Sequence, residues 1–105
     1  MSQEHAPLTE GVYYMLLALY EPRHGYGIMQ FTEEMSNGRV KLGAGTIYGA
    51  IKSLLKKKWI NTYVEDGRKK EYIITDLGKE IVELEVARLK ELYLNGQYML
   101  NQGDL

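Results

Sequence analysis

The sequence predicts a mainly helical α+β fold with three short helices, a two-stranded β-hairpin and a long C-terminal helix. Three observations predict it. Apolar residues recur at helical spacing before residue 58 and after residue 76. The stretch between them is rich in β-branched and aromatic residues, and Asp66-Gly67 divides it with a strong turn signal. With 105 residues, 45% of them hydrophobic, the chain fits one compact domain.

The first helix is expected to begin at Thr9, whose side chain can cap it, and to run to about Tyr20, where Pro22 ends it. Its apolar residues cover nearly the whole circumference. A helix with two apolar faces needs two packing partners.

The second helix is expected from Tyr26 to about Met35. The sequence Gly25-Tyr26-Gly27 opens it, and Ser36-Asn37-Gly38 is its stop signal. Three residues have the spacing of a core face: Ile28, Phe31 and Met35.

The third helix is expected to begin near Gly45-Thr46. At about 100° per residue, its core side consists of Ile47, Ile51, Leu54 and Lys58, with Leu55 at the edge. Small and basic residues point the other way: Thr46, Gly49, Lys52, Ser53 and Lys56.

The hairpin is expected to consist of strands Ile60 to Val64 and Lys70 to Thr75. With Asp66 and Gly67 as the two central turn residues, Ile60 pairs with Ile73 near the base. Arg68 and Lys69 then lie at the tip, so the hairpin has an apolar base and a basic tip.

The last helix is expected to start at Thr75-Asp76 and to reach about Leu94; the sequence leaves open whether it continues past Gly96. Its apolar seam, with steps of four, three and four, consists of Val82, Val86, Leu89 and Tyr93. One small domain can hardly cover this surface, so we expect a homodimer. We assign the interface to this seam, with Leu16 and Tyr20 of the first helix.

Charge is segregated along the chain, although the net charge is only −1. Residues 39–70 hold nine lysines and arginines against two acidic residues, a net charge of +7. The remaining segments together carry a net charge of −8. This separation indicates a basic working face on an acidic body.

The order of elements, with positive charge on the third helix and the hairpin tip, is the plan of a winged helix-turn-helix. An α-helix fits the major groove of DNA, while lysine and arginine neutralise phosphates. We therefore expect residues 1–75 to form a DNA-binding domain and residues 76–105 a dimerisation helix and tail. The alternative is a winged-helix module that docks on a protein partner without binding DNA.

Five segments resemble the PadR-like transcriptional regulators, specifically the short subfamily with a single C-terminal helix. They are residues Leu16 to Leu19, His24 to Ile28, Gly45 to Leu54, Asp66 to Tyr72 and Ile74 to Gly78. The resemblance implies a repressor dimer, with a third helix that reads the operator and a fourth helix that pairs with its twin. The chain departs from the pattern at Lys56-Lys57-Lys58, where relatives commonly have an acidic stretch; stronger attraction to phosphates follows.

The candidate DNA contacts divide by position. Lys52 and Ser53 project from the middle of the outward face and are expected at base edges. Thr46 either donates to a phosphate or caps its helix, and Tyr26 and Tyr48 either contact DNA or only pack. The remaining candidates are Gly49, which permits close approach, and the cations Lys56, Arg68, Lys69 and Lys70.

Several classes of function are disfavoured. The chain has no cysteine, and His5 and His24 lie far apart without carboxylates at ligand spacing, so we expect no metal, no cofactor and no enzyme. The longest apolar run has nine residues, too short for a membrane span of about 20, and we expect a cytoplasmic protein. A small aromatic effector or another signal is expected to release the repressor. Its candidate pocket consists of Tyr13, Tyr14, Tyr93 and Tyr98.

Overall fold

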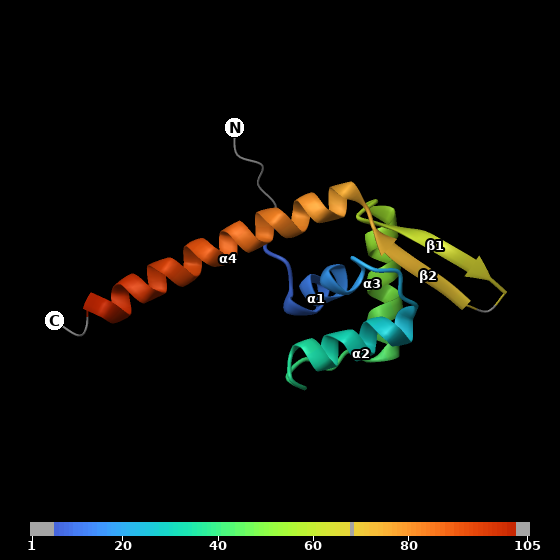
Figure 1. Ribbon diagram of the computed structural model, residues 1–105, viewed down its shortest axis with the longest axis horizontal. Helices are drawn as coiled ribbons and strands as arrows, with labels where there is room; N and C mark the ends of the chain where they lie inside the picture. Colours follow the sequence, from blue (N-terminus) through green and yellow to red (C-terminus); the bar gives the residue numbers. More distant parts are fainter. Residues whose placement is uncertain (1–5, 68, 103–105) are drawn as a thin grey trace.

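The computed structural model describes residues 6–67 and 69–102. Three helices, α1 (Glu10–Ala18), α2 (Gly25–Met35) and α3 (Ala44–Lys56), precede the hairpin of β1 (Ile60–Asp66) and β2 (Lys69–Ile74), and α4 (Asp76–Gln102) closes the chain. α4 extends beyond the body, with the hairpin at the opposite end (Figure 1). The expected mainly helical winged helix-turn-helix is confirmed.

α1 begins as expected and ends early. The Thr9 side chain accepts a hydrogen bond from the Val12 N–H and caps the helix. The helix ends at Ala18 rather than Tyr20, because the N–H groups of Leu19 and Tyr20 bond to carbonyls only three residues back.

α2 starts one residue earlier than predicted, and one expected core residue is wrong. His24 precedes the helix, and its Nδ1 accepts the Gly27 N–H at 3.2 Å. Ile28 and Thr32 are buried, whereas Met35 is 54% exposed. Ser36, which is buried and hydrogen-bonded to Val40, covers the end of the helix instead.

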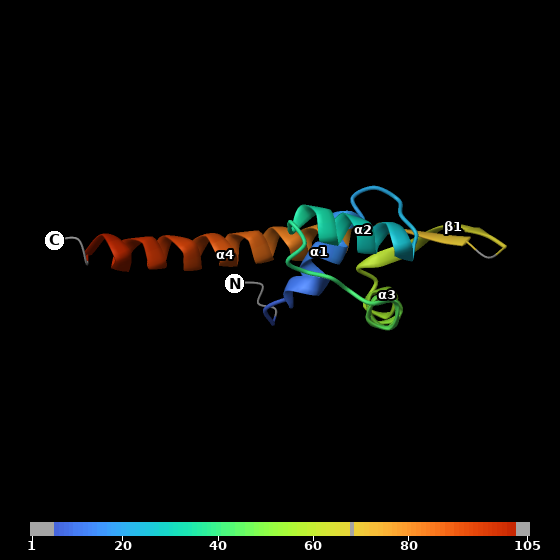
Figure 2. The same cartoon turned by 90° about the horizontal axis from the view of Figure 1, so that it is seen from below.

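α3 buries the expected apolar residues Ile47, Ile51 and Leu54. The prediction for Lys58 is wrong: the helix ends at Lys56, and Lys58 has a left-handed backbone (φ 64°) and an exposed side chain. α3 lies to one side of the line formed by α4 and the hairpin (Figure 2).

The hairpin has a different register from the predicted one. Ile60 pairs with Ile74 rather than Ile73, because the turn is displaced and β1 carries a bulge between Thr62 and Val64. Asp66 pairs with Lys69, so Asp66 belongs to a strand and not to the turn centre. Only Gly67 of the predicted turn pair has positive φ, at 60°.

α4 continues through Gly96 to Gln102. Thr75 caps it, since the Thr75 Oγ1 accepts the Gly78 N–H at 3.0 Å and donates to the Lys58 carbonyl at 2.7 Å. Its first turns complete the core, which consists of Met15, Leu16, Ala18, Leu19, Ile28, Ile47, Ile51, Leu54, Ile60, Tyr72, Ile74 and Val82. Within the described residues no helix is long and apolar enough to cross a membrane.

Candidate nucleic-acid interface

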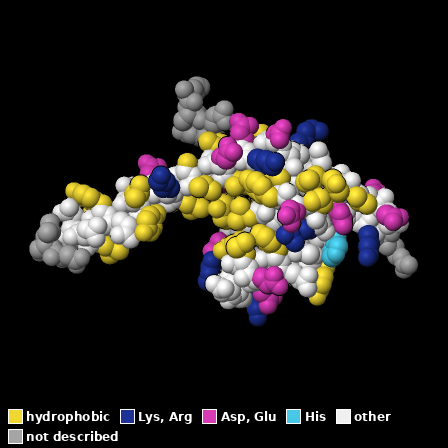
Figure 3. Space-filling view, viewed as in Figure 1, with side chains coloured by type: hydrophobic (Ala, Val, Ile, Leu, Met, Phe, Trp, Pro, Cys, Tyr) yellow, Lys and Arg dark blue, Asp and Glu magenta, His cyan; other side chains and the backbone are white. Residues whose placement is uncertain are grey.

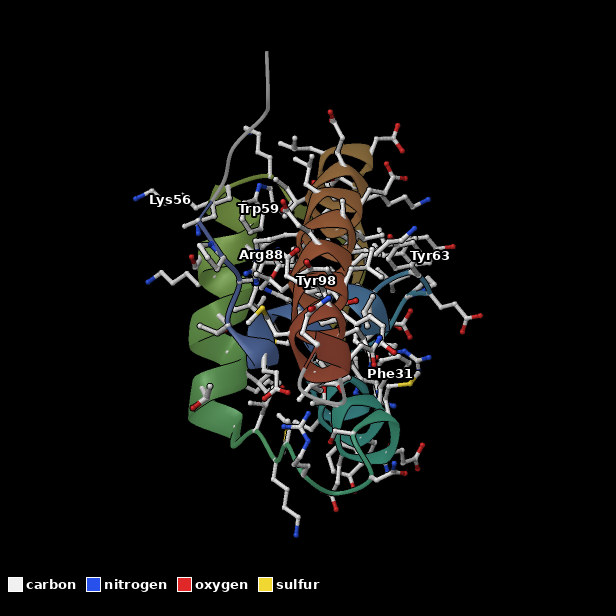
Figure 4. The ribbon with its side chains drawn as sticks, turned by 90° about the vertical axis from the view of Figure 1, so that its left-hand side faces the viewer. Phe31, Lys56, Trp59, Tyr63, Arg88 and Tyr98 are labelled. Atoms are coloured by element: carbon white, nitrogen blue, oxygen red, sulfur yellow. The ribbon has the colours of Figure 1, made fainter. Side chains whose placement is uncertain are left out.

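The outward face of α3 is an exposed surface of small and basic residues. Lys52, Ser53 and Lys56 are all exposed, as are Thr46 and Gly49 nearer the helix start. Lys56 points away from the body (Figure 4). Among the described residues, no carboxylate forms a salt bridge with Lys52 or Lys56. These two ammonium groups therefore face solvent without a competing acid.

Thr46 does not cap α3. The capping position belongs to Gly43, which makes no side-chain capping bond, and Thr46 lies three residues further on. The capping role that was one alternative for Thr46 is therefore wrong, because α3 starts earlier than the sequence indicates. Thr46 stays exposed in the first turn, where N–H groups point outward.

A pocket of about 240 Å³ lies where α2 begins, between α3 and the hairpin. It is lined by His24, Tyr26, Tyr48, Lys69, Lys70 and Tyr72. Four of the ten candidate DNA residues thus share one cavity, although they come from three elements. We call this cavity the wing pocket.

The wing pocket also contains residues that sequence reasoning missed. His24 stacks with Tyr26, with ring centroids 6.3 Å apart, and Tyr72 is a buried part of β2. Gly25 lies beneath the Tyr48 ring. His24 and Gly25 directly precede Tyr26 in the segment that resembles the family. This position was the one sequence feature that could have indicated their place in the pocket.

The charge of the hairpin is lower than its lysines indicate. Lys70 Nζ lies 3.7 Å from Glu65 Oε2 on the neighbouring strand, and both side chains are exposed. Lys69 pairs with Asp66 in the ladder. Arg68 lies outside the described residues. Because the two acids accompany the lysines, the hairpin is a weaker cationic surface than α3.

Two of the expected dimer contacts are wrong. Leu16 is fully buried and Val82 is 4% exposed, both in the core of their own chain. They cannot reach a second subunit, because they cover the core that joins α1 to α4. Tyr20, Val86, Leu89 and Tyr93 are exposed. Hydrophobic side chains occupy both edges of the projecting part of α4 (Figure 3).

The four tyrosines assigned to an effector pocket form no single cluster within one chain. Tyr13 and Tyr14 pack edge to face, with ring centroids 6.0 Å apart. Burial, followed by the negative charge of Glu85, raises the pKa of the Tyr13 hydroxyl. Tyr93 and Tyr98 are exposed on the projecting part of α4, where the Tyr93 hydroxyl accepts a hydrogen bond from Gln97.

The described part of the chain offers no candidate metal site. Within residues 6–67 and 69–102, no three histidine or acidic side chains lie close enough together to hold a metal ion.

The chain matches a known family model. Residues 14–84 match the transcriptional regulator PadR-like family. A curated relative, an uncharacterized 37.1 kDa protein in transposon TN4556 of Streptomyces fradiae, is 35% identical over 71 residues. That match covers 68% of this chain and about a fifth (20%) of the relative.

Solved structures have the same fold. A PadR family transcriptional regulator from Eggerthella lenta is 22% identical, with a TM-score of 0.70, and the match covers 85% of this chain and 80% of that one. The PadR of Bacillus subtilis, solved in complex with operator DNA, is 25% identical, with a TM-score of 0.61. There the match covers 74% of this chain and 46% of that one.

Proposed function

Since this chain belongs to the PadR-like family of transcriptional regulators, we propose that it is a repressor that binds a DNA operator as a homodimer. It is a regulator and not an enzyme. Residues 1–75 bind DNA and residues 76–105 hold the two copies together. The observation that carries the proposal is the exposed face of α3, on which Lys52 and Lys56 have no acidic partner in the described chain.

α3 enters the major groove. Lys52 and Ser53 lie in the middle of its exposed face and contact base edges, while Gly49 lets the backbone come close. Thr46 at the helix start and Lys56 near its end contact phosphates on either side. α3 thereby supplies sequence discrimination.

The hairpin holds the DNA without reading it. Lys69, Lys70 and Arg68 meet phosphates or an adjacent groove, which supplies affinity for any sequence. Glu65 beside Lys70 limits that affinity, so most discrimination stays with α3.

The second subunit covers the projecting part of α4. Val86, Leu89 and Tyr93 recur at a seam spacing and are exposed in the single chain, as is Tyr20 of α1. An aromatic effector fits the dimer centre, where Tyr13 and Tyr14 of one copy approach Tyr93 and Tyr98 of its twin. There it would change the angle between the two recognition helices, which must enter successive major grooves about 34 to 36 Å apart.

Titrations on two duplexes test the reading and holding roles. An operator selected from a random DNA pool is compared with a random duplex at several salt concentrations. Lys52→Ala should weaken operator binding about tenfold more than random binding, since a base contact is worth about 1 to 3 kcal/mol. Lys69→Ala and Lys70→Ala should weaken both duplexes equally and flatten the salt slope by about one per lost phosphate contact.

The matched control is Lys90→Ala, which removes the same charge from the exposed surface of α4 and should leave both affinities unchanged. If Lys52→Ala weakens both duplexes equally while the hairpin variants weaken only the operator, the two roles are reversed. If the wild-type protein shows no salt-dependent binding to any duplex, it is a protein-docking module instead.

A further inference from the structure

The geometry of the wing pocket points to a seat for one phosphate of the DNA backbone, and we propose that Gly25 is the positioning residue that shapes it. This inference rests on the proposed function and adds a specific ligand and a specific residue to it.

The lining suits an anion. Two ammonium groups, Lys69 and Lys70, reach the pocket from β2, and none of its six lining residues is acidic. Tyr72 of β2 also lines the pocket, and a tyrosine hydroxyl can both donate and accept a hydrogen bond. A phosphate oxygen accepts charge-assisted hydrogen bonds from ammonium groups and can also accept one from a tyrosine hydroxyl.

The start of α2 adds to this field. The positive end of the helix dipole lies at Gly25 and Tyr26, which is a favourable place for a negative charge. Residues of α3 and of the hairpin, the two elements that the proposed function brings to DNA, line the pocket. A backbone phosphate is therefore the anion that this pocket meets first.

Tyr48 closes the pocket from the α3 side. Its ring lies across Gly25: a Cβ atom built on Gly25 would lie 2.7 Å from the Tyr48 hydroxyl oxygen and 2.8 Å from Cζ. Real Cβ atoms essentially never approach a neighbour this closely. Only a glycine at position 25 lets the Tyr48 hydroxyl lie at the start of α2.

The consequence is a contact that joins three elements around one phosphate. Tyr48 precedes Lys52 by one helical turn on α3, so a phosphate fixed at Tyr48 also fixes how Lys52 meets the base edges. Losing the seat should weaken binding to every sequence, because the contact itself reads no base.

The test is Gly25→Ala, with Gly27→Ala as its matched control in the same turn of α2. A Cβ on Gly27 meets only Arg23 and His24 atoms at 3.5 Å or more, an ordinary contact. The clash at Gly25 is with the far end of a side chain, so alanine there should displace Tyr48 without unfolding the protein. Thermal unfolding of both variants checks this.

We expect Gly25→Ala to weaken binding of a random duplex about tenfold, the effect of losing one charge-assisted hydrogen bond, and Gly27→Ala to leave it unchanged. In a Tyr48→Ala background, Gly25→Ala should have no further effect. Equal affinities of the Gly25→Ala and Gly27→Ala variants would overturn the inference. So would an undiminished loss in the Tyr48→Ala background, because Gly25 would then act through something else.

Inorganic phosphate separates this inference from the proposed function. When inorganic phosphate is titrated into the full chain, the amide NMR signals of residues 25 and 26 should shift in the wild type. In the Gly25→Ala variant the signals of the same two positions should not shift. If phosphate shifts these signals while no duplex binds, the seat takes free phosphate and the proposed function fails. If the duplex binds with a steep salt dependence but phosphate leaves these signals unmoved, the proposed function stands and the seat does not.

Discussion

The two halves of α4 share one continuous helix but lie in opposite environments. In residues 76–85, Gly78, Val82 and Glu85 are buried against the body. In residues 86–102, large apolar side chains are exposed, and Tyr93 is 64% exposed. The same apolar periodicity thus has two outcomes: the first half completes the core of its own chain, whereas the second half leaves large apolar side chains exposed in the single chain.

The glycines of α4 show the same contrast. A Cβ on Gly78 would lie 2.2 Å from the Trp59 carbonyl oxygen and 2.6 Å from Ile74 Cγ1. A Cβ on Gly96 would meet nothing within 4 Å. The first glycine is required for packing, whereas the second costs helix stability without making a contact in the single chain.

The largest effect is expected from Gly78→Ala. Its methyl group would collide with a backbone carbonyl, which cannot move aside as a side chain can, so we expect a loss of about 4 kcal/mol in the free energy of unfolding. Urea denaturation followed by circular dichroism measures it. A loss below about 1 kcal/mol would mean that the start of α4 can move away from Trp59, and the contrast between the halves would be weaker than described.

Leu89→Arg should act on association and not on folding. Leu89 is exposed in the single chain, so the monomer should stay folded. The dimer Kd should rise about a hundredfold, since each of two side chains loses about 1.5 kcal/mol of burial and 1.4 kcal/mol is tenfold. Sedimentation equilibrium gives the Kd, and operator affinity should fall with it.

Leu77→Arg is the control for that comparison. Leu77 is also an exposed leucine of α4, but it lies in the packed half. Its variant should dimerise normally. If both variants lost association equally, the partner would lie along the whole of α4. A wild-type chain that stays monomeric at micromolar concentration would refute the homodimer.

The smallest effect is expected from Gly96→Ala, a gain of about 0.5 to 1 kcal/mol in helix stability, because alanine has the higher helix propensity and open space around it. Amide hydrogen exchange of residues 86–102 measures it. Slower exchange with unchanged dimer affinity is the expected pair of results. A weaker dimer instead would show that the second subunit packs closely against Gly96.

The sequence predicted the order of elements well, because local signals determine it. Thr9 caps α1, the buried face of α3 follows the helical period, and Thr75 begins α4, all as expected. The hairpin register was wrong because the turn lies one residue later than Asp66-Gly67 indicates, so that Asp66 pairs with Lys69; the bulge in β1 offsets only part of this shift.

The sequence singled out four of the six residues that line the wing pocket, but it indicated neither His24 and Tyr72 nor the arrangement of the six. Tyr26, Tyr48 and the hairpin lysines were each singled out, but their shared cavity depends on the packing of Tyr48 across Gly25. For the interface, periodicity identified an apolar seam without distinguishing residues covered by their own chain from those left bare. Leu16 and Val82 were misplaced for this reason, since burial is decided by tertiary neighbours.

The anchoring of α4 at Gly78 gives the helix the properties of a lever. Its 27 residues span about 40 Å at 1.5 Å per residue, and the end beside Trp59 is fixed by close packing. A tilt of about 5° at the anchored end displaces the far end by about 3.5 Å, roughly the 3.4 Å rise of one base pair. In the proposed homodimer, a change of a few degrees at this fulcrum would therefore be enough to move the two DNA-binding heads out of register with two half-sites.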